Sequence, residues 1–353
     1  MGKGHVRLAD VAKAAGVSQG TASNVFSRPD VVREEVRERV LKVARELGYG
    51  GPDIKGRLLR AGRVNAIGVA AVEPLTYFFD DPWARSLMTA IGEVCDASGT
   101  GIAVVSAMNE ERLAWNINSA LVDGFILLCV EGGERLVELT RQRQLPFIAL
   151  ALGIEDETIP AIGIDNVAGG AAAARHLLEL GHRDIAILSI GDVDGLVGMV
   201  APERVDPEME ATPRDRMHGY WRALAEYGIP REAVPIQGTL HDRPSTLTAM
   251  EALFSSANPP TAILAMSDKV ALFAMQWLAE RGLKVPEDVS LIGFDGVPEA
   301  ATSLPRLTTV AQPFAEIARR SVTAILENAL PENHEALDLE LVVRDSTAAP
   351  RLP

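Results

Sequence analysis

From residue 64 onward, short apolar runs alternate with stretches of helical periodicity, and this alternation constrains the fold most. The runs cover 66–72, 101–105, 124–130, 147–150, 162–164, 185–189, 261–265 and 290–294. Apolar residues follow one another within each run, which is typical of parallel strands that are buried on both faces. Eight strands are more than one ordinary sheet holds. The sequence therefore predicts an α/β body of two doubly wound parallel-sheet subdomains.

The first residues follow a different pattern, with two short amphipathic stretches on either side of Gly16-Val17-Ser18. Gly16 can adopt the left-handed conformation that ends a helix, and Ser18 can cap the next one. Each stretch has apolar residues at helical spacing: Val11, Ala12 and Ala15 in the first, and Ala22, Val25 and Phe26 in the second. A three-residue turn between such helices predicts a helix-turn-helix, although an ordinary helical hairpin has the same local pattern.

The charge is divided between these two parts. The whole chain has a formal net charge of −14, but residues 1–63 carry 13 Lys and Arg against 7 Asp and Glu, a net of +6. The remaining residues carry 21 basic and 41 acidic side chains, a net of −20. A basic head attracts phosphates while an acidic body stays off DNA, so the distribution favours DNA binding over a merely solvated basic face.

Enzyme motifs are weak in this chain. Gly16-Val17-Ser18-Gln19-Gly20 has the spacing of a nucleophile elbow, but that motif requires a strand before the serine, and here a helical pattern precedes it. No HExxH, paired CxxC or phosphate-binding loop is present, and the six histidines are scattered. The sequence therefore predicts no enzyme, no cofactor and no metal.

The sequence also predicts a cytoplasmic protein. No apolar run approaches the roughly 18–20 residues that span a bilayer, and no secretory signal is recognisable at the N-terminus. Cys95 and Cys129 do not make a disulfide framework and are expected to be reduced. The acidic tract 191–213 has no clear period and fits either a lid or an insertion without a role.

Short motifs along nearly the whole chain match those of one known protein family. The matching segments of the head are Asp10-Val11-Ala12, Ala15-Gly16-Val17-Ser18, Thr21-Ala22-Ser23 and Glu46-Leu47-Gly48-Tyr49. Those of the body include Asp123-Gly124, Gly163-Ile164-Asp165-Asn166, Leu180-Gly181-His182-Arg183, Arg216-Met217-His218-Gly219-Tyr220, Val285-Pro286-Glu287-Asp288-Val289-Ser290-Leu291-Ile292-Gly293-Phe294-Asp295 and Pro305-Arg306-Leu307-Thr308-Thr309-Val310. In their order and spacing, these segments resemble the LacI/GalR family of bacterial transcription factors.

The resemblance implies a homodimer that reads a near-palindromic operator and a periplasmic-binding-protein-like clamp that holds a small effector. It places a helix-turn-helix head at 1–51, a hinge helix or linker at 52–63 and an effector-binding and dimerisation domain at 64–353. Within that domain, we expect one subdomain at 64–163 plus 294–326 and the other at 164–293 plus 327–353. Leu59 stands where the family's hinge leucine wedges into the minor groove.

Two departures from the family concern the head and the hinge. Arg33 stands where the third helix usually has a Ser or Thr cap, so that cap is lost or supplied otherwise. Gly56 replaces the usual hinge alanine, at a cost of roughly 1 kcal/mol in helix propensity. The hinge helix is therefore expected to depend strongly on DNA.

The second helix of the motif carries the expected DNA contacts. Gln19, Gly20 and Asn24 occupy the positions that the family uses for base edges, and Gln and Asn can bond adenine in bidentate fashion. The expected phosphate contacts are Ser18, Thr21, Ser23 and Arg28, which fix the register of the protein on the duplex.

Ligands of open α/β sheets bind beyond the carboxyl ends of the strands. Asp268 and Asp295 each follow a predicted strand, and Arg216 can add a fork of donors, a combination suited to the hydroxyl groups of a sugar. The resemblance places these three residues in the pocket. Ser267 joins them, although helix capping is an equal alternative for Ser267 and Asp268. Tyr77, Phe78 and Phe79 lie in the loop after the first strand, where the resemblance places aromatics that stack on the ligand. We expect core packing to account for at least one of the three.

The sequence thus predicts a sequence-specific transcriptional regulator, most simply a repressor released by a sugar-like effector. Alternatives within this class are a regulator that needs its effector as co-repressor and an activator. A solute-binding protein of a sugar transporter shares the clamp, but the basic head and the lack of a recognisable export signal argue against it.

Overall fold

The computed structural model describes residues 6–51, 63–131, 133–151, 156–191, 197–332 and 334–351. The chain divides into two compact units, Met1–Val64 and Asn65–Pro353, which we call the head unit and the body. The predicted hinge helix, with Gly56 and Leu59, lies outside the described residues. None of the helices among the described residues is long and apolar enough to cross a membrane.

The head unit contains the predicted helix-turn-helix, formed by α1 (Leu8–Ala14) and α2 (Gln19–Ser27). Gly16 adopts a left-handed conformation at φ 66°, and the Ser18 hydroxyl accepts the backbone N–H of Thr21 at 3.0 Å. A short 3₁₀ turn (Pro29–Val31) leads to α3 (Glu34–Leu47), which ends at left-handed Gly48. The Arg33 side chain makes no capping bond to α3, as the departure from the family predicts. The three helices enclose a small core of Val11, Ala12, Ala15, Ala22, Val25, Val40 and Ala44.

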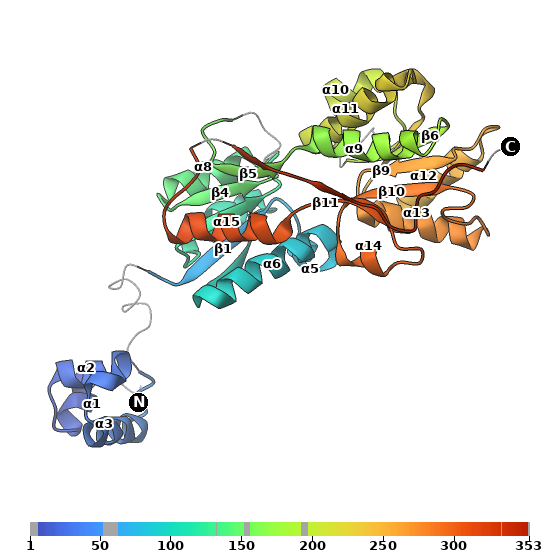
Figure 1. Ribbon diagram of the computed structural model, residues 1–353. Coiled ribbons are helices and arrows are strands. Elements are labelled where there is room, and N and C mark those ends of the chain that lie inside the picture. Colours follow the sequence, from blue (N-terminus) through green and yellow to red (C-terminus); the bar gives the residue numbers. More distant parts are fainter. Residues whose placement is uncertain are drawn as a thin grey trace. The chain divides into compact units, whose positions relative to one another are not determined.

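The body consists of two lobes that lie side by side, each built on one sheet (Figure 1). The first lobe has the sheet order β12-β5-β4-β3-β1-β2, with all strands parallel. Its strands are β1 (Ala66–Ala71), β2 (Gly101–Ser106), β3 (Gly124–Leu128), β4 (Phe147–Leu150), β5 (Ala161–Ile164) and β12 (Glu335–Leu337). Its helices are α5 (Tyr77–Asp80), α6 (Pro82–Ser98), α7 (Glu110–Ser119), α8 (Glu134–Gln142) and α15 (Phe314–Leu326).

The second lobe has the sheet order β13-β11-β10-β9-β6-β8-β7, in which only the outermost strands β7 and β13 pair antiparallel. Its strands are β6 (Ile185–Ile190), β7 (Gly198–Met199), β8 (Ile236–Thr239), β9 (Ala262–Ala265), β10 (Ser290–Asp295), β11 (Thr308–Ala311) and β13 (Glu340–Val342). Its helices are α9 (Asn166–Glu179), α10 (Val205–Glu208), α11 (Ala211–Glu226), α12 (Arg243–Phe254), α13 (Asp268–Glu280) and α14 (Pro298–Thr302), with 3₁₀ turns at Pro202–Arg204 and Arg231–Ala233.

The strands divide between the lobes differently from the predicted boundaries. Residues 294–311 were expected in the first subdomain, but β11 pairs in parallel with β10 and lies in the second sheet. Residues 327–337 were expected in the second subdomain, but β12 pairs with β5 in the first sheet. The chain therefore returns to the first lobe after β11 and leaves it again after β12. The sheet to which a short strand belongs is decided by its hydrogen-bonded neighbour, which its own residues do not reveal.

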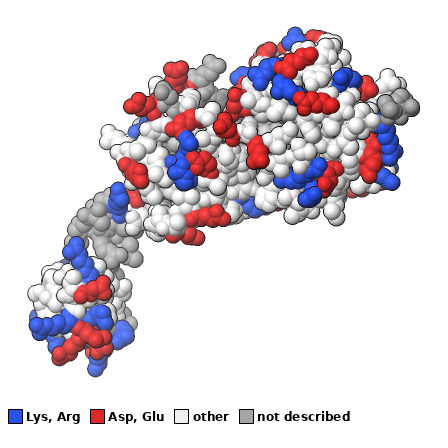
Figure 2. All heavy atoms as spheres, in the orientation of Figure 1, with Lys and Arg blue, Asp and Glu red and all other residues white. Residues whose placement is uncertain are grey.

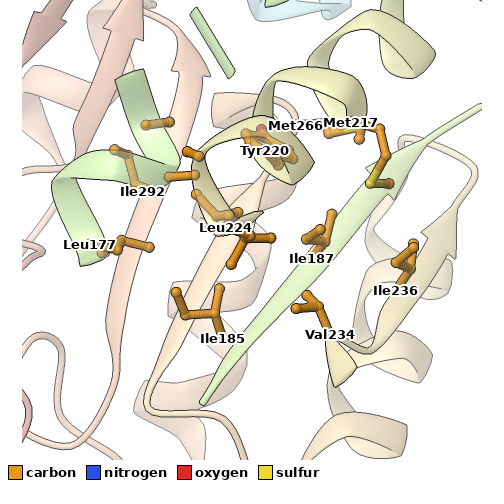
Figure 3. Packing of buried hydrophobic residues seen from close by; sticks show 14 of the residues in the cluster. Leu177, Ile185, Ile187, Met217, Tyr220, Leu224, Val234, Ile236, Met266 and Ile292 are labelled. Carbon is orange, nitrogen blue, oxygen red and sulfur yellow. The ribbon is translucent and has the colours of Figure 1, made fainter. Parts of the chain in front are cut away.

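Helices α9 and α11 approach each other unusually closely, because both carry a glycine at the crossing. A Cβ atom on Gly219 would lie 2.3 Å from the carbonyl oxygen of Val167, and one on Gly170 would lie 2.4 Å from that of Arg216. Beneath this crossing, Tyr220 and Leu224 of α11 pack onto Ile185 and Ile187 of β6 (Figure 3). The contact between the two backbones holds Arg216 at the end of α11 that faces the ligand cavity described below.

The described part of the acidic tract, 197–213, belongs to the fold of the second lobe. Val200, Val205 and Met209 are buried in its core, and Pro213 lies in the first turn of α11. These residues therefore contribute to the core of the second lobe and lead into α11.

Candidate functional sites

The first candidate site is the outer face of α2. Ala22 and Val25 point into the head core, which leaves Gln19, Gly20 and Asn24 exposed. Of the four predicted phosphate contacts, Ser18 and Arg28 are exposed, whereas Thr21 and Ser23 are half-buried. Lys and Arg side chains are prominent on the visible face of the head unit (Figure 2). The helix thus exposes Gln19, Gly20 and Asn24, the three residues expected to contact base edges.

The second candidate site is a cavity of about 620 Å³ in the body. Its lining comes from the carboxyl ends of strands in both sheets: Glu73 after β1, Glu131 after β3, Ala151 after β4, Gly191 after β6, His241 after β8, Ser267 after β9 and Gln312 after β11. This is where open parallel sheets bind ligands. A molecule in the cavity would contact both lobes.

Arg216 and Asp295 form a buried ion pair at this cavity, with Nη2 and Oδ1 3.6 Å apart. Arg216 Nε donates to Asn166 Oδ1 at 3.0 Å, Nη1 donates to the Met266 carbonyl oxygen, and the guanidinium lies over the Phe294 ring. Burial raises the pKa of Asp295 well above its ordinary value, although Arg216 opposes this shift. The protein therefore keeps two buried ionisable groups here at an energetic cost, which is typical of a binding site.

Gln312 connects Asp295 to an aromatic wall of the cavity. Its Nε2 donates to Asp295 Oδ1 at 2.9 Å, and its Oε1 accepts the indole N–H of Trp83 at 3.0 Å. Because Trp83 belongs to α6 and Asp295 to β10, this amide joins the two lobes at the cavity.

Asp81 joins the lobes a second time. It caps α6 through Oδ1, while Oδ2 accepts a hydrogen bond from Lys269 Nζ of α13 at 3.1 Å. The same oxygen lies 3.8 Å from His241 Nδ1, and His241 Nε2 is 2.8 Å from Ser267 Oγ. Burial lowers the pKa of His241 to about 4, so its imidazole is neutral at pH 7.

Asp268 does not reach the cavity. Its carboxylate is fully buried and accepts the backbone N–H groups of Gly296 and Val297 at 2.8 and 2.9 Å and the Thr309 hydroxyl at 2.6 Å. These bonds fix the loop that follows Asp295, whose backbone has a φ of 122°. Asp268 was expected to contact the ligand, but it holds this loop in place instead. The reason is that the helix α13, which begins at Asp268, turns the carboxylate toward the loop and away from the cavity.

The predicted aromatics separate into three environments. Tyr77 lines the cavity and its hydroxyl lies 3.8 Å from Cys129 Sγ, whereas Phe78 is buried in the core of the first lobe. Phe79 is 65% exposed and outside the cavity lining. Phe78 is therefore the core residue that was expected among the three, whereas Phe79 differs from the expectation. Three consecutive residues in one helical turn point in different directions. Ser267 caps α13 by accepting the N–H of Val270, which confirms the capping interpretation. It also lines the cavity, and its contact with a ligand stays a prediction.

Sequence reasoning missed Asp81, Trp83, Glu131, His241 and Gln312 at the cavity. His241 and Gln312 follow β8 and β11, two strands that the apolar pattern did not reveal. Asp81 precedes a proline at the start of α6, the pattern of a helix cap, but it also lines the cavity and its second oxygen bonds Lys269. Their position in the chain could have revealed these residues, because each of them follows a strand or begins a helix at the carboxyl edge of a sheet.

Comparisons with known proteins identify the two parts of the chain that carry these candidate sites. Residues 7–51 match the model for bacterial regulatory proteins of the lacI family, and residues 174–347 match a periplasmic binding protein-like domain. The chain is 35% identical over 351 residues to an HTH-type transcriptional regulator of Mycobacterium tuberculosis, with 97% of both chains covered. It belongs to the LacI family.

Other relatives and structures extend this result. The HTH-type transcriptional regulator IpsA of Corynebacterium glutamicum is 33% identical, with 87% of this chain and 86% of the relative covered. The structure of the transcriptional regulator CelR with cellobiose has a TM-score of 0.67 at 26% identity and covers 97% of this chain and 99% of that one. The Lac repressor bound to ONPG, at 24% identity and a TM-score of 0.74 with 97% and 99% covered, shares the fold.

As a LacI-family protein, this chain is a DNA-binding transcriptional regulator and not an enzyme. Its head and body correspond to the DNA-binding and periplasmic-binding-protein-like parts of the family. Among the described residues, no group of three or more His, Cys, Asp or Glu side chains is placed to hold a metal ion.

Proposed function

We propose that this LacI-family regulator is a cytoplasmic homodimeric repressor that is released from a near-palindromic operator by a small polyhydroxylated effector. The exposed polar face of α2 carries the DNA part of the proposal, because Gln19 and Asn24 project from a helix whose opposite face is buried. Two such heads related by a two-fold axis would read two half-sites. The cavity between the lobes carries the effector part.

The cavity suits a sugar-like molecule on chemical grounds. Arg216 and Asn166 supply donors and acceptors, and Tyr77 and Trp83 supply aromatic surface. Structures similar to this chain hold cellobiose, in CelR, and ribose, in a LacI-family regulator of Enterococcus faecium that covers 81% of this chain at 26% identity and a TM-score of 0.67. Because an effector would contact both lobes, its binding would change how they close and thereby the spacing of the two heads.

Selection from random DNA duplexes tests the repressor proposal. The full-length protein should enrich a two-fold symmetric sequence, and the affinity for it should fall steeply with salt because bound phosphates release counterions. Enrichment of no symmetric site at any salt concentration would contradict the proposal. An effector that strengthens operator binding would instead indicate a co-repressor mechanism.

Asn24→Ala should relax base preference at one position in each half-site. The expected cost is about 1–3 kcal/mol, the contribution of one bidentate contact to a base. Arg28→Ala is the matched control, since loss of an exposed phosphate contact weakens all sequences alike. If binding measurements on a set of singly substituted operators show uniform weakening for Asn24→Ala as well, Asn24 contacts phosphate instead of a base.

A further inference from the structure

The wall of the effector cavity carries more acidic than basic side chains. Among the described residues, its carboxyl groups belong to Glu73, Asp81, Glu131, Glu210, Asp215, Asp295 and Glu335. Its guanidinium groups belong to Arg214 and Arg216. Lys269 is not part of the lining, but its ammonium group pairs with the lining residue Asp81. A ligand in this cavity therefore meets a wall of net negative formal charge.

Each of these cations already has a carboxylate partner within the protein. Arg216 pairs with Asp295, Lys269 with Asp81 at 3.1 Å, and Arg214 Nε with Asp215 Oδ1 at 3.8 Å. Two further donors of Arg216, Nε and Nη1, bond Asn166 and the Met266 carbonyl oxygen. A phosphate or carboxylate on a ligand would therefore share each of these cations with a carboxylate that already neutralises it.

His241 of the cavity wall does not change this charge balance. His241 is neutral at pH 7, because burial lowers its pKa to about 4, and it already bonds Ser267. His334 Nε2 donates to the carbonyl oxygen of Asp156 at 3.1 Å.

A hydroxyl group of a ligand is not repelled by the carboxylates of the cavity wall. It can donate to a carboxylate oxygen and accept from an amide or guanidinium group without bringing net charge into a partly desolvated site. Like charges placed together in such a site cost several kcal/mol. The aromatic faces of Tyr77 and Trp83 can cover the apolar faces of a sugar ring.

We propose that the cavity takes a hydroxyl-rich ligand without negative charge and rejects the phosphate esters and carboxylic acids of the same molecule. This inference rests on the proposed function of the cavity as the effector site. It narrows the effector to uncharged sugars, polyols and their amino derivatives, and it excludes sugar phosphates and sugar acids.

Matched ligand pairs test the inference on the full-length protein. We would measure thermal stabilisation and then calorimetric affinity for pentoses, hexoses, alditols and disaccharides, including D-ribose, D-glucose and cellobiose. Each would be paired with its phosphate ester or acid, such as ribose 5-phosphate, glucose 6-phosphate and gluconate. At least one uncharged compound should bind, and its anionic counterpart should bind about 100-fold or more weakly, the ratio that like-charge repulsion of a few kcal/mol produces.

A charge variant tests the cause of the discrimination. Asp215→Asn removes the carboxylate that pairs with Arg214, so the ratio of the two dissociation constants should fall, by about tenfold for each 1.4 kcal/mol of repulsion removed. Asp345→Asn removes the same charge from an exposed pair with Arg306 outside the cavity lining and should leave the ratio unchanged.

The outcomes separate this inference from the proposed function. An anionic compound that binds as tightly as its uncharged counterpart would overturn the inference and leave the effector proposal intact. If no compound of either kind binds to protein that still binds its operator, both the inference and the sugar-like effector fall, while the DNA-binding part of the proposal stands.

Discussion

Replacing Arg216 with Met is expected to abolish the response to effector and to lower the free energy of unfolding of the body by about 3 kcal/mol. The substitution leaves the Asp295 carboxyl, with 7% of its side chain exposed, without its cationic partner. It also removes the donors that bond Asn166 and the Met266 carbonyl oxygen. We expect the lower end of the range for a broken buried pair, because the raised pKa of Asp295 lets it take up a proton.

A double-mutant cycle separates stability from function. Asp295→Asn removes the opposite charge while keeping the shape, so the double variant should be less destabilised than the sum of the two single variants. All three variants should fail to respond to effector and should still bind operator. Arg214→Met is the matched control: it removes a cavity arginine whose pair with Asp215 is partly exposed, so unfolding should change by about 1 kcal/mol or less. Strictly additive losses in the cycle would show that the pair is not coupled.

Gly219→Ala is expected to destabilise the body by about 3 kcal/mol or more, since overpacking against rigid atoms is costly. The added Cβ would lie 2.3 Å from the carbonyl oxygen of Val167 and 2.7 Å from the backbone nitrogen of Ala171. Backbone atoms of α9 cannot move aside as a flexible side chain can, so α11 would have to shift and carry Arg216 with it. Effector affinity should therefore fall together with stability.

Gly92→Ala is the matched control for this substitution. Gly92 lies within α6, and a Cβ there would meet nothing within 4 Å. The same chemical change should therefore stabilise by up to about 1 kcal/mol through helix propensity. Calorimetric scans of both variants check the pair of expectations, and an unchanged melting temperature for Gly219→Ala would contradict the close crossing. The helix-turn-helix belongs to the separate head unit, so its own unfolding should be unaffected.

Local patterns in the sequence determined much of this protein. The turn at Gly16 and Ser18, the polar face of α2 and eight strands of the body follow from periodicity, caps and apolar runs, which act over a few residues. Because these patterns are local, they did not reveal β8 and β11. Both strands are short and contain polar residues, such as Gln237 and Thr309, that are buried by neighbours far away in the sequence.

Only the tertiary structure decided the membership of the sheets and the composition of the cavity. Strands β11 and β12 belong to sheets that long-range pairing selects, so the predicted subdomain boundaries near 294 and 327 shifted. Arg216 and Asp295 meet although they are far apart in the chain, and the resemblance to a family anticipated both. Asp268 also follows a strand, yet its carboxylate bonds the loop after Asp295 instead of lining the cavity. The direction of this side chain is set by α13, which begins at Asp268. The contacts of Asp81 with Lys269 and of Trp83 with Gln312 exist only because two separately folded lobes place their strand ends face to face.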